Sequence, residues 1–176
     1  MKPIKLTLQN AHNLENGDIL HCGRNSFMSK AIRFVTGSDF VSHTAPVLKD
    51  GPWIYIVDSQ IDGTRLRHLE EWINKYNYKV IVTRGAFNGL GYHELLEKME
   101  PYLNSWYAYG DILRHVWYKL TKRWKVNKNA AKYLTCSEFV GRLIGAPEAY
   151  KITPIELFNY CLSEGHTIPH SNENNG

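Results

Sequence analysis

Hydrophobic and polar residues recur along this chain at two spacings, and each spacing predicts a different kind of element. Alternation over 41–48 and 53–59 predicts two strands, and the Asp50-Gly51 pair between them is typical of a hairpin turn. Shorter apolar runs at 17–22 and 78–84 predict two further strands. These segments together predict a small antiparallel sheet.

Apolar residues spaced three and four positions apart predict helices around these strands. Gly37, Gly145 and Gly165 mark the ends of three of them, and Pro154 opens the last. The sequence contains no internal repeat or linker, so we expect one α+β domain over 1–170 and a disordered tail over 171–176. The predicted helices span 27–35, 66–73, 92–100, 111–124, 136–144 and 154–165.

The predicted hairpin sets which residues of its two strands face each other. A turn centred between Asp50 and Gly51 pairs residues whose numbers sum to 101, which places His43 directly opposite Asp58. Directly opposed residues share a face with their Cβ atoms roughly 4.5–5.5 Å apart, so a carboxylate can reach an imidazole. Two prolines near the turn cannot donate to the ladder, and a slip of one residue would separate the pair onto opposite faces.

A cysteine opens the predicted helix that begins near residue 136. Thr135 is a suitable N-cap and Glu138 its capping-box partner, which places Cys136 at the first helical position, where the helix dipole favours a thiolate. A cysteine nucleophile also needs a base and a group that orients the base, and His43 and Asp58 supply these roles. The Cys136 N–H would be one oxyanion donor. The pattern therefore predicts a cysteine hydrolase.

Each of these residues also has an ordinary structural interpretation. Most free cysteines are small buried hydrophobic residues, and a strand histidine is usually satisfied by its neighbours. Asp58 could simply end a strand. The position of Cys136 at a capped helix start favours the catalytic interpretation.

The cysteine count and the N-terminus bear on the compartment and on cofactors. Three scattered cysteines make no disulfide framework, and no apolar stretch is long enough for a signal peptide or a membrane span. We therefore expect a cytoplasmic protein with no transmembrane segment, with the envelope or a phage particle as alternative settings. We expect no metal and no cofactor, because the histidine and cysteine spacings are not those of zinc sites and no phosphate-binding glycine loop is present.

The net charge of +4 is unevenly distributed, with seven basic residues and no acid in the stretch 114–132. Such a stretch could meet an anionic surface such as a membrane. Its tryptophans share one apolar stripe, so a core-facing helix with a solvated basic face is the preferred interpretation, and no nucleic acid is expected. The candidate surface residues are Arg114, Lys119, Lys122 and Arg123.

Several motifs, taken in order, resemble those of the circularly permuted NlpC-type papain-like cysteine hydrolases, above all the YiiX/YaeF group, which is related to lecithin retinol acyltransferase. The resemblance runs from about Gly17 to Leu162. In this family the histidine strand precedes the cysteine helix, as it does here. The motifs are Gly17-Asp18-Ile19-Leu20, Ser29-Lys30-Ala31-Ile32, Thr36-Gly37-Ser38, Ser42-His43, Tyr55-Ile56-Val57-Asp58-Ser59, Arg84, Cys136-Ser137-Glu138 and Thr153-Pro154.

The resemblance implies a papain-like α+β fold, with an antiparallel sheet or half-barrel packed against the cysteine helix. It implies cleavage of an amide bond in a peptidoglycan-like peptide, another peptide or an N-acyl substrate, through an acyl-enzyme on Cys136 with His43 and Asp58. Tyr109 resembles an aromatic position near the family's site, and Ser42 is a second candidate substrate or oxyanion residue. An acyltransferase or a lipid, ester or thioester hydrolase at a membrane surface is one alternative. A binding module without catalytic activity is another.

Overall fold

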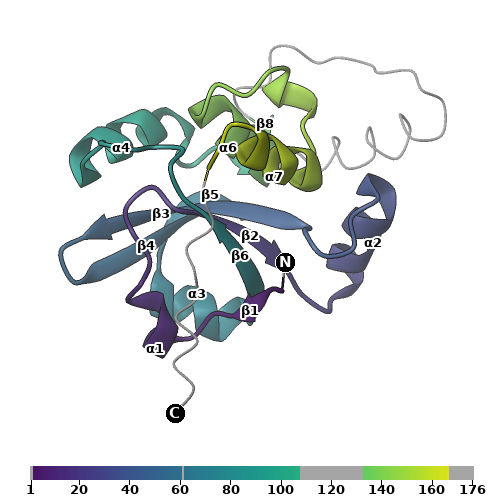
Figure 1. The fold of residues 1–176 in the computed structure, drawn as a ribbon, viewed down its shortest axis with the longest axis horizontal. Coiled ribbons are helices and arrows are strands. Elements are labelled where there is room, and N and C mark those ends of the chain that lie inside the picture. The colour runs from purple at the N-terminus through teal and green to yellow at the C-terminus, as the bar shows by residue number, and fades with distance from the viewer. Residues whose placement is uncertain (1, 61, 108–132, 167–176) are drawn as a thin grey trace.

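The computed structural model describes residues 2–60, 62–107 and 133–166, and these form an α+β fold (Figure 1). Six antiparallel strands make one sheet in the order β1-β6-β2-β3-β4-β5, and β7 and β8 form a separate parallel pair. The strands are β1 (Ile4–Lys5), β2 (Ile19–Gly23), β3 (His43–Asp50), β4 (Trp53–Gln60), β5 (Gly63–His68), β6 (Lys79–Thr83), β7 (Trp106–Tyr107) and β8 (Tyr133–Leu134). The helices are α1 (Leu8–Ala11), α2 (Phe27–Thr36), α3 (Leu69–Tyr76), α4 (Tyr92–Met99), α6 (Cys136–Leu143) and α7 (Pro154–Ser163), with short 3-10 turns at Glu100–Tyr102 and Ala149–Lys151.

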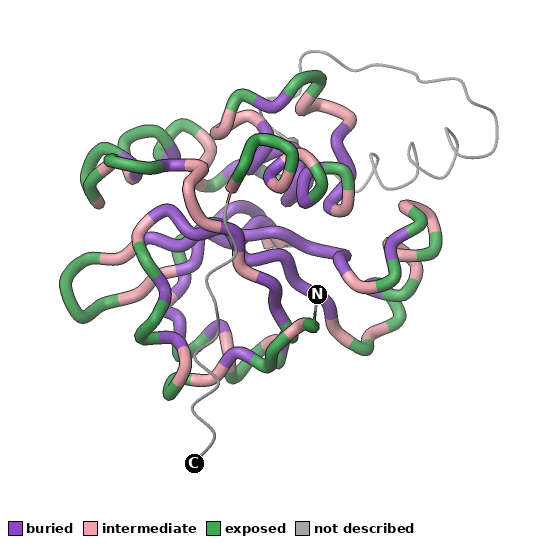
Figure 2. The backbone as a smooth tube through the Cα atoms, viewed as in Figure 1, coloured by how far each residue is buried: buried purple, intermediate pink, exposed green. Residues whose placement is uncertain are grey.

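Helices cover both faces of the sheet. Helices α4, α6 and α7 lie on one face, α1 and α3 on the other, and α2 stands at the side (Figure 1). The central strands are buried along most of their length (Figure 2). Alternate strand residues enter different apolar clusters because successive side chains point to opposite faces. The strand residues are Ile19, Leu48 and Val57 on the α6 side and Leu20, Ala45 and Ile56 on the α3 side.

The predicted fold class is confirmed, since an antiparallel sheet packs against the helix that begins at Cys136. The predicted helix over 66–73 is partly wrong, because 66–68 belong to strand β5 and helix α3 begins only at Leu69. Pairing of β5 with β4 supplies the backbone hydrogen bonds there, which overrides the helical spacing of Leu66 and Leu69. The predicted helix over 111–124, the basic stretch 114–132, Tyr109 and the tail 171–176 lie outside the described residues.

The hairpin between β3 and β4 forms as predicted, but its register differs from the predicted one by two residues. The observed pairs include Val47 with Ile56 and Asp50 with Trp53, so paired numbers sum to 103. The two turn residues are Gly51, with φ of 55°, and Pro52, whose ring fixes φ near −65°. His43 is therefore not directly opposite Asp58. A shift of two residues nevertheless keeps both side chains on the same face, because the side-chain period of a strand is two.

Strand β3 changes partner along its length. Its first four residues, His43 to Pro46, pair with β2, whereas the ladder with β4 begins at Val47. Pro46 has no N–H to donate and stands at the change. In the first half of β3, the edge that faces β4 is therefore not paired with it. Helix α6 packs there against both strands.

Candidate active site

Helix α6 begins as the sequence predicts. Thr135 has an extended backbone and its hydroxyl accepts a 3.2 Å hydrogen bond from the Glu138 N–H, so Cys136 is the first helical residue. The predicted capping box is only half formed, because the carboxylate of Glu138 accepts a 2.8 Å hydrogen bond from Arg142 and none from the Thr135 N–H. Ser137 donates a 2.7 Å hydrogen bond to the carbonyl of Ile152, which fixes the first turn against the following loop. The Cys136 thiol is thereby held at a rigid, buried helix start.

His43 and Asp58 form a buried hydrogen-bonded pair. The Nε2 atom of His43 lies 2.7 Å from Oδ1 of Asp58, and the side chain of Asp58 is fully buried. The ring of Tyr78 stacks on the His43 ring, with centroids 5.6 Å apart and planes 15° from parallel. These contacts fix the orientation of the imidazole, as the predicted role of Asp58 requires.

The same histidine interacts with Cys136 through its other side. Because Nε2 is engaged by Asp58, Nδ1 is the ring nitrogen left for the interaction with the thiol that lowers the pKa of Cys136 and raises that of His43. The three predicted residues therefore form one row, in the order Cys136, His43, Asp58. The structure thus brings together the three residues predicted from the sequence, which come from α6, β3 and β4.

Charge in this row favours a thiolate beside an imidazolium. Burial alone raises the pKa of the Cys136 thiol, but the charge and hydrogen bond of His43 and the backbone N–H of Thr44 outweigh it and lower that pKa below its ordinary value. Burial alone lowers the pKa of His43, whereas the neighbouring Cys136 thiolate and the bond to Asp58 raise it well above its ordinary value. The two shifts describe one ion pair.

The N–H of Thr44 reaches the sulfur because of the way β3 pairs. Successive N–H groups of a strand point to opposite edges, and Val47, three residues further on, donates to the Asp18 carbonyl next to β2. The Thr44 N–H therefore points away from β2, on the edge where the ladder with β4 has not begun. In place of a strand carbonyl it faces the Cys136 sulfur, whose pKa it lowers.

Other groups surround the carboxylate of Asp58, and sequence reasoning did not find them. Nε of Arg67 lies 3.3 Å from Oδ2 of Asp58, an ion-pair distance without the alignment of a hydrogen bond, while its Nη2 makes 2.6 Å bonds to Asp62. The Gln60 amide donates to Oδ1 of Asp58 at 3.3 Å and to the Tyr78 hydroxyl at 3.0 Å. The alternation in Thr64-Arg65-Leu66-Arg67-His68 is the available signal for Arg67, whereas the apolar spacing over 66–73 predicts a helix there.

Two less central candidates have different outcomes. The Ser42 hydroxyl is buried, lies 2.5 Å from the hydroxyl of Ser29 in α2 and donates to the Cys22 carbonyl at 3.3 Å, so it ties β3 to α2. Its role toward substrate stays a prediction. Tyr109 lies outside the described residues, and its role also stays a prediction.

The remaining cysteines, Cys22 and Cys161, are buried in the apolar clusters. Burial raises the pKa of Cys161 to about 11 and raises that of Cys22 far above its ordinary value. Neither thiol is activated. Within the ranges that the structure describes, no group of three or more His, Cys, Asp or Glu side chains could hold a metal ion, and no helix is long and apolar enough to cross a bilayer.

The comparisons with known proteins concern mainly the fold. No protein-family model and no curated protein matches the chain. The chain is similar to the solved structure of the metalloprotein yiiX from Escherichia coli O157:H7, with a TM-score of 0.50 and 25% sequence identity. The match covers 73% of this chain and 63% of the E. coli chain, so it spans less than two thirds of that protein. The likeness supports the YiiX-like part of the resemblance, while the relation to permuted NlpC-type enzymes and the acyltransferase stays a prediction.

Proposed function

We propose that this chain is a cysteine hydrolase that cleaves an amide bond through an acyl-enzyme on Cys136. The observation that carries the proposal is the row in which His43 stands between the Cys136 thiol and the buried Asp58 carboxylate. A thiolate beside an imidazolium is the reactive form of a cysteine nucleophile. The helix start adds the oxyanion donor that acyl transfer needs.

Each residue has one role in the proposed reaction. The Cys136 thiolate attacks the carbonyl carbon, and the Cys136 N–H stabilises the oxyanion, because the first intrahelical bond of α6 comes only from the Phe139 N–H. The imidazolium of His43 gives its proton to the departing amine, which leaves the acyl-enzyme. Neutral His43 then takes a proton from water, whose oxygen attacks the thioester and regenerates the thiolate. Asp58 keeps the ring in position and stabilises its charged form.

A metal ion is another way to use a cysteine, a histidine and a carboxylate, and the E. coli neighbour is named a metalloprotein. Metal ligands converge on one point. Here Nε2 of His43 is held by Asp58, and among the described residues no three His, Cys, Asp or Glu side chains are placed so that they could hold one ion. The described residues therefore do not fit a metal centre, and no step of the proposed reaction passes through one.

The experiment that tests the proposal is mass spectrometry of Cys136 after exposure to a panel of activated amides, esters and thioesters. We expect an acyl group on Cys136 whose loss to water follows first-order kinetics, and its identity reports the bond that is cleaved. Adding an amine or alcohol acceptor distinguishes hydrolysis from acyl transfer, because a transferase would pass the acyl group to the acceptor in preference to water.

Two variants make the result decisive. Cys136→Ser removes the nucleophile and should abolish labelling, while His43→Gln should slow it by two or more orders of magnitude if the histidine activates the thiol. Cys22 serves as an internal control, since it is buried and not activated. A folded protein whose Cys136 takes no acyl group from any member of the panel would support the binding-module alternative.

A further inference from the structure

A cavity of about 440 Å³ lies between the start of α2 and the edge of the sheet, and every charged residue in its described lining is basic. This volume is within the range of small-molecule sites. The polar side chains that line the cavity are Lys5, Arg24, Arg33 and Lys79, together with the amides of Asn25 and Asn77. The catalytic row described above contributes none of its residues to the cavity.

The four cations have no carboxylate partner in the part of the chain that the structure describes. None of them is within 4.0 Å of an Asp or Glu oxygen there. Like charges around one cavity repel each other, and the field that they produce favours a bound anion. Arg33 gives independent evidence for a bound anion. Its Nε is buried and has no hydrogen-bond acceptor among the described residues, although its Nη1 donates to the Asp39 carbonyl at 3.1 Å.

Arg24 is held in place before any ligand arrives. Its Nε donates to the Ser26 hydroxyl at 3.2 Å, and its guanidinium lies over the rings of Tyr78 and Tyr76, 5.3 and 5.7 Å from their centroids. A planar guanidinium fixed in this way presents its remaining N–H groups in the fork that matches a phosphate. This side chain is therefore already ordered in the free protein, so ligand binding costs little further conformational entropy there.

We propose that this cavity binds the phosphate group of an anionic ligand. Four cations and two side-chain amides match a group with several oxygens and more than one negative charge better than they match a single carboxylate. The volume leaves room for the part of the ligand that carries the phosphate. The proposal goes beyond the proposed hydrolysis and does not depend on Cys136, although Arg24 contacts the same Tyr78 that stacks on His43.

The phosphate could belong to a free metabolite or to a lipid headgroup. Phe27 and Met28, which follow Asn25 at the start of α2, are 86% and 46% exposed, and an anionic bilayer would cover them. Binding of inorganic phosphate, measured by calorimetry or by NMR titration, tests the cavity itself. Sedimentation with phosphatidylglycerol vesicles, compared with phosphatidylcholine vesicles, then tests the lipid source.

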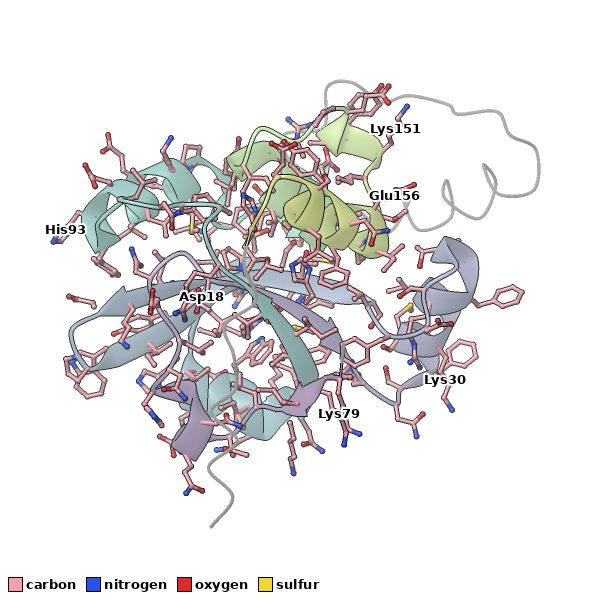
Figure 3. The ribbon with its side chains drawn as sticks, in the orientation of Figure 1. Asp18, Lys30, Lys79, His93, Lys151 and Glu156 are labelled. Atoms are coloured by element: carbon pink, nitrogen blue, oxygen red, sulfur yellow. The ribbon has the colours of Figure 1, made fainter. Side chains whose placement is uncertain are left out.

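The variants are chosen so that net charge is matched. Arg24→Gln and Lys79→Gln should each weaken phosphate binding by about tenfold or more, because each removes a charged partner. Lys30→Gln removes the same charge from an exposed residue of α2 that does not line the cavity, and it should change binding less than twofold (Figure 3). Lys79 is itself exposed, so its variant should fold even if Arg24→Gln disturbs the tyrosines. All variants are made on Cys136→Ser, so that turnover plays no part.

The outcomes separate clearly. Phosphate binding that is lost in Lys79→Gln and kept in Lys30→Gln supports the phosphate site in the cavity, whether or not the protein sediments with vesicles. If the protein also sediments with phosphatidylglycerol vesicles and added phosphate releases it from them, the phosphate is that of a lipid headgroup. The proposal is overturned if the parent protein shows no saturable phosphate binding. It is equally overturned if Lys30→Gln weakens binding as much as Lys79→Gln, since the effect would then be one of net charge alone.

Discussion

The negative charge of Asp58 should set the pH at which His43 loses its proton. Asp58→Asn keeps an oxygen acceptor of the same reach for Nε2, now 2.7 Å from Oδ1, but removes the charge. A charge-assisted hydrogen bond is about twice as strong as a neutral one, a difference of about 1.4 kcal/mol for a buried pair. That difference corresponds to a fall of about one unit in the pKa of His43.

The sign of the change follows from which form Asp58 stabilises. His43 has a raised pKa, so its imidazolium persists to a higher pH than that of a free histidine. Removing the carboxylate destabilises the imidazolium and narrows the pH range over which the thiolate and imidazolium coexist. The alkaline limit of that range should move down by about one pH unit.

Alkylation of Cys136 measures this limit without knowledge of the substrate. Iodoacetate and iodoacetamide both react with the thiolate, so the thiolate fraction cancels in the ratio of the iodoacetate rate to the iodoacetamide rate. Because only iodoacetate is an anion, this ratio reports the positive charge beside the sulfur. The ratio should fall as His43 loses its proton, and the midpoint in Asp58→Asn should lie about one unit lower. The adduct is assigned by mass spectrometry of the peptide that contains Cys136.

Asp62→Asn is the matched control for this experiment. Asp62 accepts 2.6 Å bonds from the same Arg67 that lies beside Asp58, but it does not touch His43. Its variant should therefore keep the parent midpoint. The reasoning is refuted if Asp58→Asn, folded by circular dichroism, also keeps the parent midpoint, because Asp58 would then contribute no charge stabilisation to His43.

Four other predictions concern the rest of the molecule. Iodoacetamide should label Cys136 well below the ordinary thiol pKa of about 8.5 and spare Cys161 until the protein unfolds, and equal rates would contradict thiol activation. Burial, and then His166, lowers the pKa of His21 to about 3, below its unfolded value of 6.5. The free energy of unfolding should therefore decrease as the pH is lowered from 6.5 to 3, by up to about 1.4 kcal/mol per pH unit. Denaturant melts should show a flatter profile for His21→Gln and the parent profile for exposed His93→Gln. A Cβ on Gly23 would lie 2.5 Å from the Phe40 carbonyl oxygen, so Gly23→Ala should cost about 1–3 kcal/mol in the same melts, and an unchanged midpoint would argue against this packing. Chelators should leave the proposed hydrolysis unchanged, because the site residues do not fit a metal centre. Loss of activity that a metal restores would refute this.

Local chemistry accounts for the parts of the fold that the sequence predicted well. The start of α6 depends on Thr135 and its N–H partner three residues later, and α7 begins at Pro154 after a Thr153 cap, so both signals lie within one turn of the chain. Strand β5 was missed for the opposite reason. Its identity depends on pairing with β4, and the apolar residues of 66–73 fit a helix when they are taken alone.

The hairpin shows how a wrong register gave a correct contact. The predicted turn residues were one step away from the actual Gly51-Pro52 turn, which changed the sum of paired numbers by two. A change of two preserves the face, so His43 and Asp58 still meet, now as diagonal neighbours. Arg67 and Tyr78 could not be assigned in this way, because their approach to the site depends on how β5 and β6 are placed around the hairpin.

The site exists because the ladder between β3 and β4 stops at Val47 and does not extend to His43. If their ladder continued to His43, the Thr44 N–H would bond a β4 carbonyl and the edge would be closed. Pro46 stands where the pairing changes, so Thr44 keeps a free donor and α6 can bring Cys136 to it. A buried thiolate needs such donors, since burial alone favours the neutral thiol. The interruption of the ladder at Pro46, a residue that weakens the register argument from sequence, is thus the feature that leaves the Thr44 N–H facing the thiolate.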